Sequence, residues 1–502
     1  MEINFKPLSN TLDSRMNVFL MSDELKLSSI LNEINAENND VFSKILSKDN
    51  LFKGKLNSTS SSFALPRDGK IITFVGIGDV NKIARKQLNT IGASIATKLN
   101  GMKVDMASIY IEESIFQQKI NIKDAALYIA EGLKLRNYKF NKYYVDKKKE
   151  HELSLKTINI IVNNSEEITQ AFRKYNSIVN SVNFTRDLVS EPGNVLYPES
   201  FANRCLEMRD SGLIVKVLNE NEMKSLGMGS LLAVGQGSAN PPRMAVLEWW
   251  GDSNGEKVPP IAVIGKGVTF DTGGINLKSS THIAEMKYDM TGAAVVAGLM
   301  KTLAEQKVPK NVVGLLGLVE NMPSGSAQRP SDVVTSMSGQ TIEVENTDAE
   351  GRMVLADVMW YAQTTYNCST IIDLATLTGA IGVALGDEFA GLFSNNDELA
   401  NDLLESGKEV NELLWRMPLS EHYDNRINSE IADIRNTGKF SGAGATTAAQ
   451  FLQRFLINKS STKWAHLDIA GVSWTSNGEL TNGLKGATGF GIRLLEHYIT
   501  KK

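Results

Sequence analysis

Two carboxylates and a guanidinium stand at alternate positions in the segment Asn346–Arg352. In an extended chain successive side chains point to opposite faces, so Asp348, Glu350 and Arg352 would share one face. Such an edge could hold cations through its carboxylates and a small anion through its guanidinium. The same pattern also fits a surface ladder of ion pairs, so its chemistry depends on what else the fold brings near it.

A second charged group lies upstream, in the glycine-rich stretch 265–278. This stretch follows the apolar run 261–264, which predicts a strand. Lys266, Asp271 and Lys278 are therefore expected to leave the end of that strand in a loop. Glycine lets a backbone approach a ligand closely, so the loop suits a binding site.

Asp289 adds a further carboxylate just before a predicted helix, where it could instead be the N-cap. Clustered carboxylates repel and raise one another's pKa, and divalent metals remove that repulsion. Two such ions about 3.5–4 Å apart make a hydrolytic site. Ligation by oxygen without His or Cys favours Mn, Mg, Co or Zn. The residues that could converge in this way are Lys266, Asp271, Lys278, Asp289, Asp348, Glu350 and Arg352.

Other catalytic patterns fit the sequence less well. Residues 251–255 match the G-x-S-x-G nucleophile elbow in letters, but a turn and a strand follow instead of the required helix. None of the five histidines pairs at H-x-x-x-H spacing, and His466 is predicted to pack within a strand. Gly76-x-Gly78 lacks the third glycine of a dinucleotide fingerprint and predicts a tight turn.

Apolar runs and helical patterns alternate along the chain and would position the charged residues. Residues 1–165 predict a small N-terminal α/β domain. Residues 166–190 predict a long connecting helix, with acidic residues in its first turn. Residues 191–502 predict a larger catalytic domain, also α/β, with a mainly parallel central sheet flanked by helices. Such sheets bind ligands beyond the carboxyl ends of their strands.

The boundaries of the predicted elements follow from these patterns. The runs that predict strands are 15–22, 71–76, 104–111, 157–162, 213–218, 244–249, 261–264, 312–318 and 370–375. The patterns that predict helices are 80–99, 122–136, 166–190, 291–305, 352–365, 396–407 and 445–457.

The overall composition is that of an ordinary globular protein, with 42% hydrophobic and 22% charged residues among 502. A net charge of -4 gives no attraction to nucleic acid or anionic membranes, and the one short basic run is 147–149. The two cysteines, Cys205 and Cys368, exclude a disulfide scaffold and suit a reducing cytosol. No signal peptide and no stretch of about 20 apolar residues is found, so we expect a cytoplasmic protein without a membrane segment.

Three segments together resemble the leucyl aminopeptidase family of cytosolic exopeptidases, which hold two zinc or manganese ions. They are Gly265–Lys278, Asn321–Gly325 and Asn346–Arg352, and the last looks like the family signature N-T-D-A-E-G-R. Shorter matches lie at 183–189, 375–380 and 466–471. The likeness is close over about residues 180 to 500, whereas the N-terminal part agrees only in size and α/β character.

The resemblance implies a role for each charged residue. Asp271 and Glu350 would bridge two divalent metal ions, Mn²⁺ or Zn²⁺, in each subunit. Asp348 would complete the more exchangeable site, and Lys266 and Asp289 would complete the tighter one. A lysine that binds a metal must be neutral, which neighbouring cations enforce by depressing its pKa. The free α-amine of a peptide would bind the tight site, so one N-terminal residue is removed at a time.

The resemblance also implies how the bond is broken. A water activated by the two metals would attack the scissile carbonyl while Lys278 stabilises the oxyanion. Arg352 is too cationic to act as a base, and it would hold a bicarbonate that relays the proton. The substrate-binding residues that the resemblance implies are Met286, Thr376, Leu377, Gly379 and Ala487.

Two positions depart from the common family pattern. Ser279 follows Lys278 where proline is frequent, which could loosen the loop. Ala487 stands where animal members carry methionine, as expected of bacterial-type members, so the preference for an N-terminal Leu over other residues stays open. Met286 could be a core residue instead of a pocket residue.

The family resemblance further implies a homohexamer, built as a dimer of trimers, that acts on peptides with a free N-terminus in intracellular peptide turnover. Some bacterial relatives also bind DNA, which gives a second hypothesis, an additional DNA-binding or regulatory role of the hexamer. The acidic composition argues against nucleic acid as a partner, and a gel shift at moderate salt would test it. A catalytically inactive scaffold is disfavoured because every ligand position is filled.

Overall fold

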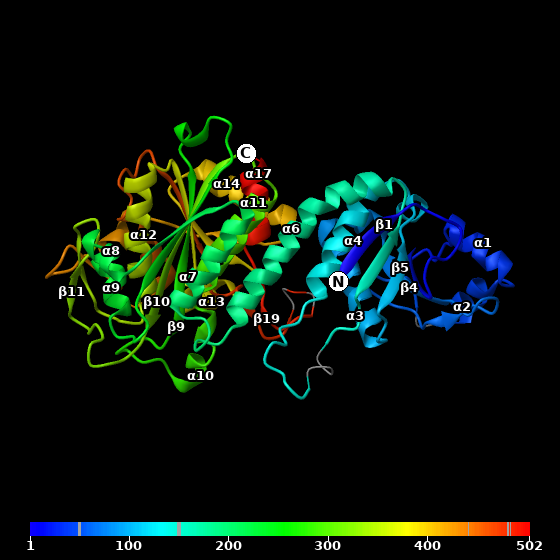
Figure 1. Cartoon of the computed structure of the whole chain (residues 1–502), viewed down its shortest axis with the longest axis horizontal. Helices are drawn as coiled ribbons and strands as arrows, with labels where there is room; N and C mark the ends of the chain where they lie inside the picture. Colours follow the sequence, from blue (N-terminus) through cyan, green and yellow to red (C-terminus); the bar gives the residue numbers. More distant parts are fainter. Residues whose placement is uncertain (49–51, 148–151, 440, 479–480, 482, 502) are drawn as a thin grey trace. The chain divides into compact units, whose positions relative to one another are not determined.

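The computed structural model describes residues 1–48, 52–147, 152–439, 441–478, 481 and 483–501. Residues 148 and 149 of the basic run lie outside this set. The chain forms two compact units (Figure 1). Unit 1 comprises Met1–Val179 and Asn477–Leu484, and unit 2 comprises Asn180–Ser476 and Lys485–Lys502. The long helix α6 (Ser165–Ser190) begins in unit 1 and ends in unit 2.

Unit 1 is built on a six-stranded sheet in the order β1-β6-β5-β2-β4-β3. Every pair is parallel except β3 with β4. The strands are β1 Glu2–Lys6, β6 Thr157–Ile161, β5 Met106–Tyr110, β2 Met16–Ser22, β4 Ile71–Gly78 and β3 Phe63–Ala64. The helices are α1 Ser29–Glu37, α2 Val41–Lys48, α3 Arg85–Gly101 and α4 Ile122–Arg136. Helices α3 and α4 pack backbone to backbone, since a Cβ on Gly92 would lie 2.1 Å from the carbonyl of Ile129.

Unit 2 is built on an eight-stranded sheet in the order β15-β14-β17-β13-β9-β10-β8-β7. The central strands β17, β13, β9 and β10 are parallel, whereas β14, β8 and β7 pair antiparallel with their inner neighbours. The bounds are β15 Leu414–Arg416, β14 Ala390–Ser394, β17 Lys463–Asp468, β13 Thr370–Ala375, β9 Ile261–Asp271, β10 Asn311–Asn321, β8 Arg243–Trp250 and β7 Ile214–Leu218. The predicted α/β class with a mainly parallel central sheet is confirmed.

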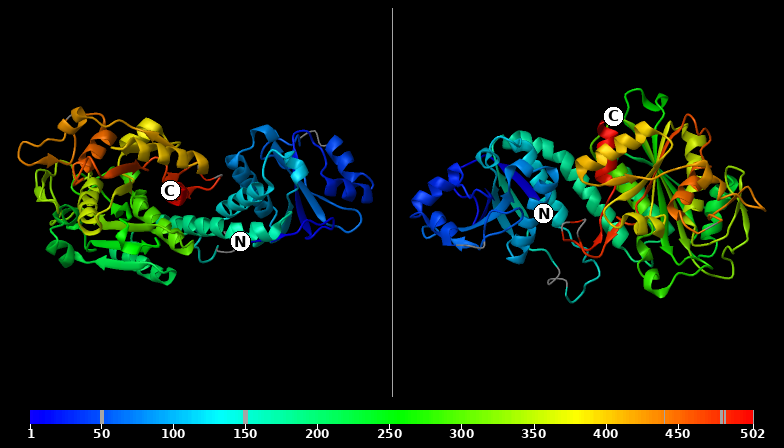
Figure 2. Two further views of the ribbon diagram at one scale, coloured as in Figure 1. Left: turned by 90° about the horizontal axis from the view of Figure 1, so that it is seen from above. Right: turned by 180° about the vertical axis from the view of Figure 1, so that it is seen from behind.

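Helices cover both faces of the unit 2 sheet (Figures 1 and 2). A Cβ on Gly314 of β10 would meet Met300 of α11, whereas one on Gly317 would meet Val354 of α12. Because these two glycines are three positions apart, they face opposite sides of the strand. Helices of unit 2 include α7 Pro198–Leu206, α9 Gly229–Gly235, α11 Thr291–Glu305, α12 Gly351–Tyr366, α14 Asp397–Val410, α16 Gly444–Gln453 and α17 Ile492–Lys501.

Short elements complete unit 2 and surround the strand ends. A three-stranded sheet joins β11 Val333–Thr335, β12 Thr341–Glu343 and β16 Ile434–Arg435, and a hairpin pairs β18 Trp474–Thr475 with β19 Gly486–Ala487. The short helices are α8 Glu220–Ser225, α10 Ser280–Ile283, α13 Gly379–Leu385 and α15 Glu421–Asn425, with 3₁₀ turns that include η4 Gly255–Lys257 and η5 Met286–Tyr288. The polar turn predicted at residues 251–255 is confirmed, because η4 leads into a strand.

Strand β9 is longer than predicted. It continues past Ile264 to Asp271, so Lys266 and Asp271 lie within the strand and not in a loop. The reason is tertiary packing, since a Cβ on Gly265 would lie 2.5 Å from Cα of Ala293 in α11. The glycines that suggested a loop instead admit a helix close to the strand.

The segment Asn346–Arg352 is not extended, so the predicted basis for a shared face is wrong, although Asp348 and Glu350 still reach the same carboxylate cluster. The backbone N–H of Asp348 donates to Oδ1 of Asn346 at 2.8 Å, and the N–H of Ala349 donates to the Asn346 carbonyl at 3.1 Å. Asparagine favours such a turn because its side chain replaces a backbone acceptor. Glu350 then has helical backbone angles and α12 begins at the next residue.

In the parts of the chain that the structure describes, no helix combines the length and the apolar character that a membrane crossing requires.

Candidate metal centre

The charged residues gather beyond the carboxyl ends of the parallel strands. Asp271 ends β9 and is in register with Asn321, the last residue of β10. Thr376 directly follows β13. Polar groups therefore lie at the carboxyl ends of the central strands, where ligands of α/β sheets bind.

Three carboxylates form the cluster. Asp271, Asp348 and Glu350 each place one oxygen within 4.8 Å of the others, an arrangement that could hold a metal ion. Asp271 and Glu350 are buried, whereas the side chain of Asp348 is 34% exposed. Burial and the charge of Asp271 raise the pKa of both Glu350 and Asp348 above their usual values.

Lys266 links the cluster to two other segments. Its Nζ lies 2.8 Å from Oδ1 of Asp289, 2.8 Å from Oε1 of Glu350 and 2.9 Å from the carbonyl of Thr376. Burial alone would lower the pKa of Lys266, but the carboxylates of Asp289, Glu350 and Asp271 raise it above its usual value. The protein's own charges therefore keep this lysine protonated, and only additional cations can favour the neutral amine that a metal ligand requires.

Lys278 lies on the more open side of the cluster. Its Nζ is 2.8 Å from Oδ2 of Asp271 and 2.5 Å from Oδ1 of Asp348. Burial lowers the pKa of Lys278, but the neighbouring carboxylates, Asp271 first, raise it above its usual value. This ammonium group is thus a fixed positive charge at the edge of the carboxylate cluster.

Asp289 is joined to the cluster through Lys266 and does not cap the helix that follows it. The N-cap of α11 is Met290, so the capping alternative is wrong. Oδ1 of Asp289 instead accepts from the hydroxyl of Thr376 at 2.8 Å and from Lys266. Burial raises the pKa of Asp289 well above its usual value against the opposing charge of Lys266.

Arg352 is a buried guanidinium at the start of α12. Its Nη1 donates to the carbonyl of Asn436 at 2.7 Å, whereas its Nε has no hydrogen-bond partner among the described residues. Burial lowers the pKa of Arg352 to about 10, although Glu350 and Asp468 oppose this shift. A buried donor without an acceptor favours a bound anion or water.

Several amide side chains that hold the cluster were not predicted. Nδ2 of Asn321 donates to Oδ1 of Asp271 at 2.8 Å and to the carbonyl of Thr347 at 3.1 Å. Asn276 accepts from the N–H of Thr347 at 2.9 Å. Asn436 accepts from the N–H of residue 346 at 3.2 Å and donates to its carbonyl at 2.7 Å. For Asn321 the available signal was its place just after the predicted strand 312–318, which is weak by itself, and no such signal marked Asn276 or Asn436.

The five predicted substrate-binding residues lie on short elements around the strand ends. Met286 is a partly exposed residue of η5, Gly379 opens α13, and Ala487 lies in β19 opposite Trp474. The Trp474 ring stacks on Tyr288 of η5 with centroids 5.7 Å apart, which joins the β18–β19 hairpin to η5. Thr376 reaches the cluster directly, and Leu377 follows it.

His466 was predicted to pack within a strand, and this is confirmed. It lies in β17, is fully buried, and its Nδ1 is 2.5 Å from Oδ1 of Asp373 on β13. The imidazole is therefore paired with a carboxylate of the neighbouring strand.

The donor set fits divalent metal ions. Carboxylate oxygens and an amine nitrogen are suitable ligands for Mn²⁺ or Zn²⁺. Oδ2 of Asp289 lies 2.8 Å from the ammonium group of Lys266, and Oδ1 of Asp348 lies 2.5 Å from that of Lys278. In this structure the two lysines thus supply the positive charge beside these carboxylates.

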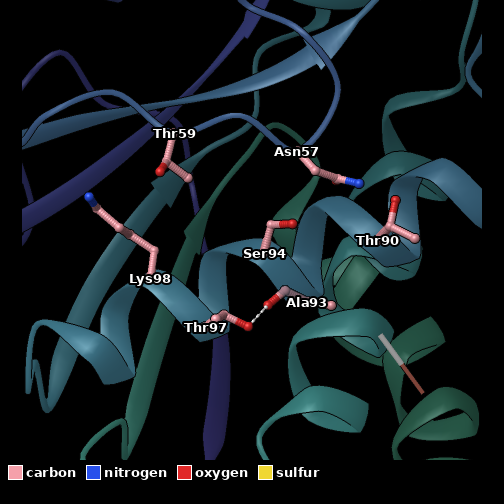
Figure 3. A pocket seen from close by; sticks show the side chains of 7 residues that line it. All are labelled: Asn57, Thr59, Thr90, Ala93, Ser94, Thr97 and Lys98. Atoms are coloured by element: carbon pink, nitrogen blue, oxygen red, sulfur yellow. Dashed lines mark hydrogen bonds between the residues drawn. The ribbon is translucent and has the colours of Figure 1, made fainter. Parts of the chain in front are cut away.

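A hollow in unit 1 has a different character (Figure 3). It encloses about 460 Å³ between α3 and the segment before β3. Its lining residues are Asn57, Thr59, Thr90, Ala93, Ser94, Thr97 and Lys98. None of these lining residues is a carboxylate, whereas the cluster of Asp271, Asp348 and Glu350 lies in unit 2.

A helix-covered parallel sheet with a carboxylate and lysine cluster beyond its strand ends defines a metal-dependent hydrolase. The family model described as the cytosol aminopeptidase family, catalytic domain, matches residues 183–496, and that of the family's N-terminal domain matches residues 18–147. The chain belongs to the cytosol aminopeptidase family. It is a metal-dependent aminopeptidase, as the resemblance implied.

Relatives with known names agree over the full length. The probable cytosol aminopeptidase of Rickettsia felis is 44% identical over 503 residues, which cover 99% of each chain. The protein with the same name in Rickettsia bellii is 43% identical with the same coverage. Among solved structures, the bottromycin maturation enzyme BotP in complex with Mn is 29% identical, with a TM-score of 0.84 over 97% of this chain and 99% of that one.

Proposed function

We propose that this enzyme is a leucyl aminopeptidase of the bacterial type, which removes Leu and other residues from the N-terminus of peptides with the aid of two divalent ions. The observation that carries the proposal is the cluster of Asp271, Asp348 and Glu350 within 4.8 Å, flanked by two lysines. Mn²⁺ or Zn²⁺ suits this ligand set, and BotP, a structural relative, was solved with Mn.

The ligands divide into two sites that share carboxylates. Asp271 and Glu350, both buried, would be ligands shared by the two ions. Asp348, the more exposed carboxylate, completes the exchangeable site. Lys266 and Asp289, which are both buried, would complete the tighter site.

Lys278 stabilises the charge that develops on the substrate. When bound, two divalent ions supply an activated water and polarise the scissile carbonyl. The ammonium group of Lys278 is held by Asp271 at 2.8 Å and is only partly buried, so it can face the carbonyl oxygen. A fixed donor aimed at a developing oxyanion strengthens as negative charge accumulates there.

Arg352 holds the anion that moves the proton. Its Nη1 is occupied by the carbonyl of Asn436, whereas the buried Nε has no protein acceptor among the described residues. Bicarbonate offers oxygens that can accept from a guanidinium and can also take up and release a proton. Arg352 itself stays cationic at neutral pH and serves only to orient the anion.

The substrate binds by its free α-amine and its first peptide group. The amine is bound at the end of the cluster formed by Lys266 and Asp289, which restricts cleavage to one N-terminal residue. Thr376, Leu377 and Gly379 contact the peptide backbone. The pocket for the first side chain is lined by Met286 and Ala487.

The parts of the chain have separate tasks in this proposal. Residues 191–502 carry out catalysis, residues 1–165 form the N-terminal domain, and residues 166–190 connect these two parts.

We further infer a homohexamer that acts in the cytoplasm on peptides during intracellular turnover. Sedimentation of the purified protein tests the hexamer.

The proposed activity is tested by metal reconstitution. Enzyme stripped by a chelator is reloaded with Mn, Zn, Mg or Co and assayed against a panel of aminoacyl amides. We expect no hydrolysis before reloading, restoration by Mn or Zn, and fastest cleavage of leucyl and similar amides. Hydrolysis by the stripped enzyme would contradict the proposal.

A further inference from the structure

Asp468 is a buried carboxylate that the roles described above leave unused. It ends β17, in register with Ala375 at the end of β13. Its Oδ1 accepts from the N–H of Leu377 at 3.1 Å and from the N–H of Ala470 at 3.3 Å. Its Oδ2 accepts from the hydroxyl of Thr378 at 2.7 Å. One side of the turn 376–378 is thus bound by a single carboxylate.

The other side of the same turn is bound to the metal centre. The carbonyl of Thr376 accepts from Nζ of Lys266 at 2.9 Å, and its hydroxyl donates to Oδ1 of Asp289 at 2.8 Å. The turn therefore lies between Asp468 and the cluster, with hydrogen bonds on both sides. A shift of this turn would therefore move its hydrogen-bond partners in the metal centre and would also displace its contacts with any group bound beside it.

Thr378 links Asp468 to the next helix, α13. Its hydroxyl donates to Asp468 and accepts from the N–H of Ile381 at 3.2 Å, which makes it the N-cap of α13. Helix α13 has seven residues, too few to be stable alone, so its start depends on this cap. Gly379, its first residue, is held in place by the same contact.

Burying a carboxylate costs free energy of desolvation, so stability alone does not favour Asp at this position. Asp468 is fully buried, and replacing buried ionic groups by apolar ones of similar size is often neutral or stabilising. Both of its oxygens are used on backbone or hydroxyl donors of adjacent turns. The side chain therefore restricts the geometry of the turn through contacts on both of its oxygens.

We propose that Asp468 is a positioning residue, which fixes the turn 376–378 so that its backbone groups meet the peptide backbone of the substrate beside the metal centre. The inference rests on the proposed contact of this turn with substrate. Asp468 itself touches neither substrate nor the cluster and acts through Leu377 and Thr378.

Two substitutions in the metal-loaded enzyme test the inference. Asp468→Asn keeps the volume but leaves one acceptor oxygen for three donors, and Thr378→Val removes the hydroxyl that Asp468 binds. For Leu-Gly-Gly we expect each variant to raise KM about ten- to a hundredfold, as for loss of a hydrogen bond to a charged group. For leucinamide, which has no residue beyond the scissile bond, the rise is smaller.

The double variant shows whether the two residues act as one unit. If Asp468 acts through Thr378, the combined change raises KM about as much as one change alone. Hydrogen exchange gives a readout that does not require turnover. Amides of residues 377–381 should exchange faster in Asp468→Asn than in the wild type.

Asp357→Asn is the matched control. Asp357 is another buried carboxylate of unit 2, which accepts from the N–H groups of Leu231 at 2.9 Å and Met337 at 2.8 Å. Its replacement should lower the melting temperature without changing KM for either substrate.

An unchanged KM for Leu-Gly-Gly in Asp468→Asn, an equal rise for both substrates, or effects that multiply in the double variant would overturn the positioning role. A wild-type holoenzyme that hydrolyses no aminoacyl amide would instead overturn the proposed function.

Discussion

Nζ of Lys266 lies 2.8 Å from Oε1 of Glu350, which joins strand β9 to the start of helix α12. The helix approaches the lysine closely, because a Cβ on Gly351 would lie 2.7 Å from Cδ and Cε of Lys266. The lysine is therefore confined between the helix and the carboxylates. Its position depends on the absence of a side chain at residue 351.

Gly351→Ala tests this confinement. The added methyl group displaces Lys266, so we expect metal at the tight site to bind about tenfold or more weakly, as for other changes in groups that support metal ligands. Titration calorimetry of the stripped enzyme with Mn²⁺ measures the change. Gly101→Ala, where nothing lies within 4 Å of the added Cβ, is the control. Equal Mn²⁺ affinity in both variants would show that Lys266 is not confined.

Lys278→Met tests the oxyanion role. The substitution keeps the length of the side chain and removes its charge, so kcat should fall by about 10²- to 10³-fold while KM changes less. Steady-state kinetics with leucinamide measure both constants. Lys301→Met, which removes a lysine paired with Glu305 on the surface of α11, should leave kcat unchanged. A kcat within a few-fold of the wild type in Lys278→Met would exclude the role.

Arg352→Gln tests the anion. In buffer depleted of carbon dioxide, added bicarbonate should raise kcat of the wild type if the proposed anion binds the guanidinium and relays the proton. The variant should be slow and insensitive to bicarbonate. Activity is followed as a function of bicarbonate concentration at constant ionic strength and pH. The same response in both proteins would assign bicarbonate to another site.

Asp357 predicts a pH dependence of stability. Burial raises its pKa to about 7 despite hydrogen bonds from backbone N–H groups, against about 3.9 in an unfolded chain. The folded state therefore binds this proton more tightly. The contribution to stability is full below about pH 4 and is lost as the pH rises toward about 7.

The measurement is the melting temperature of the wild type minus that of Asp357→Asn. This difference should fall between about pH 4 and pH 7 and stay constant at higher pH. A difference that does not change over this range would show that Asp357 titrates normally.

The sheet was predictable because its central strands are continuous apolar runs. The runs at 370–375 and 312–318 correspond to β13 and β10, and the helix predicted at 291–305 is α11. Burial on both faces leaves such strands without polar positions, which makes them visible in one sequence. Charged residues that directly follow such an apolar run stand out in the sequence, so their place at the strand ends was also predictable.

Two local features escaped prediction because tertiary contacts decide them. β9 extends to Asp271 because α11 packs on Gly265, and glycine by itself indicates a loop. The turn at Asn346 depends on a hydrogen bond from its own side chain, where alternating charges suggested an extended strand. Asn436 and Asp468 act on residues distant in sequence, so no spacing rule points to them.

The central claim is that Asp348 and Glu350 are ligands of a two-metal site. The most direct measurement is the number of Mn²⁺ ions bound per subunit, determined together with leucinamide hydrolysis, in stripped and reloaded wild type, Asp348→Ala and Glu350→Ala. We expect two ions and full activity in the wild type. We expect fewer than two ions in each variant, and a loss of kcat of about 10²-fold or more. Two tightly bound ions and unchanged hydrolysis in either variant would contradict the claim.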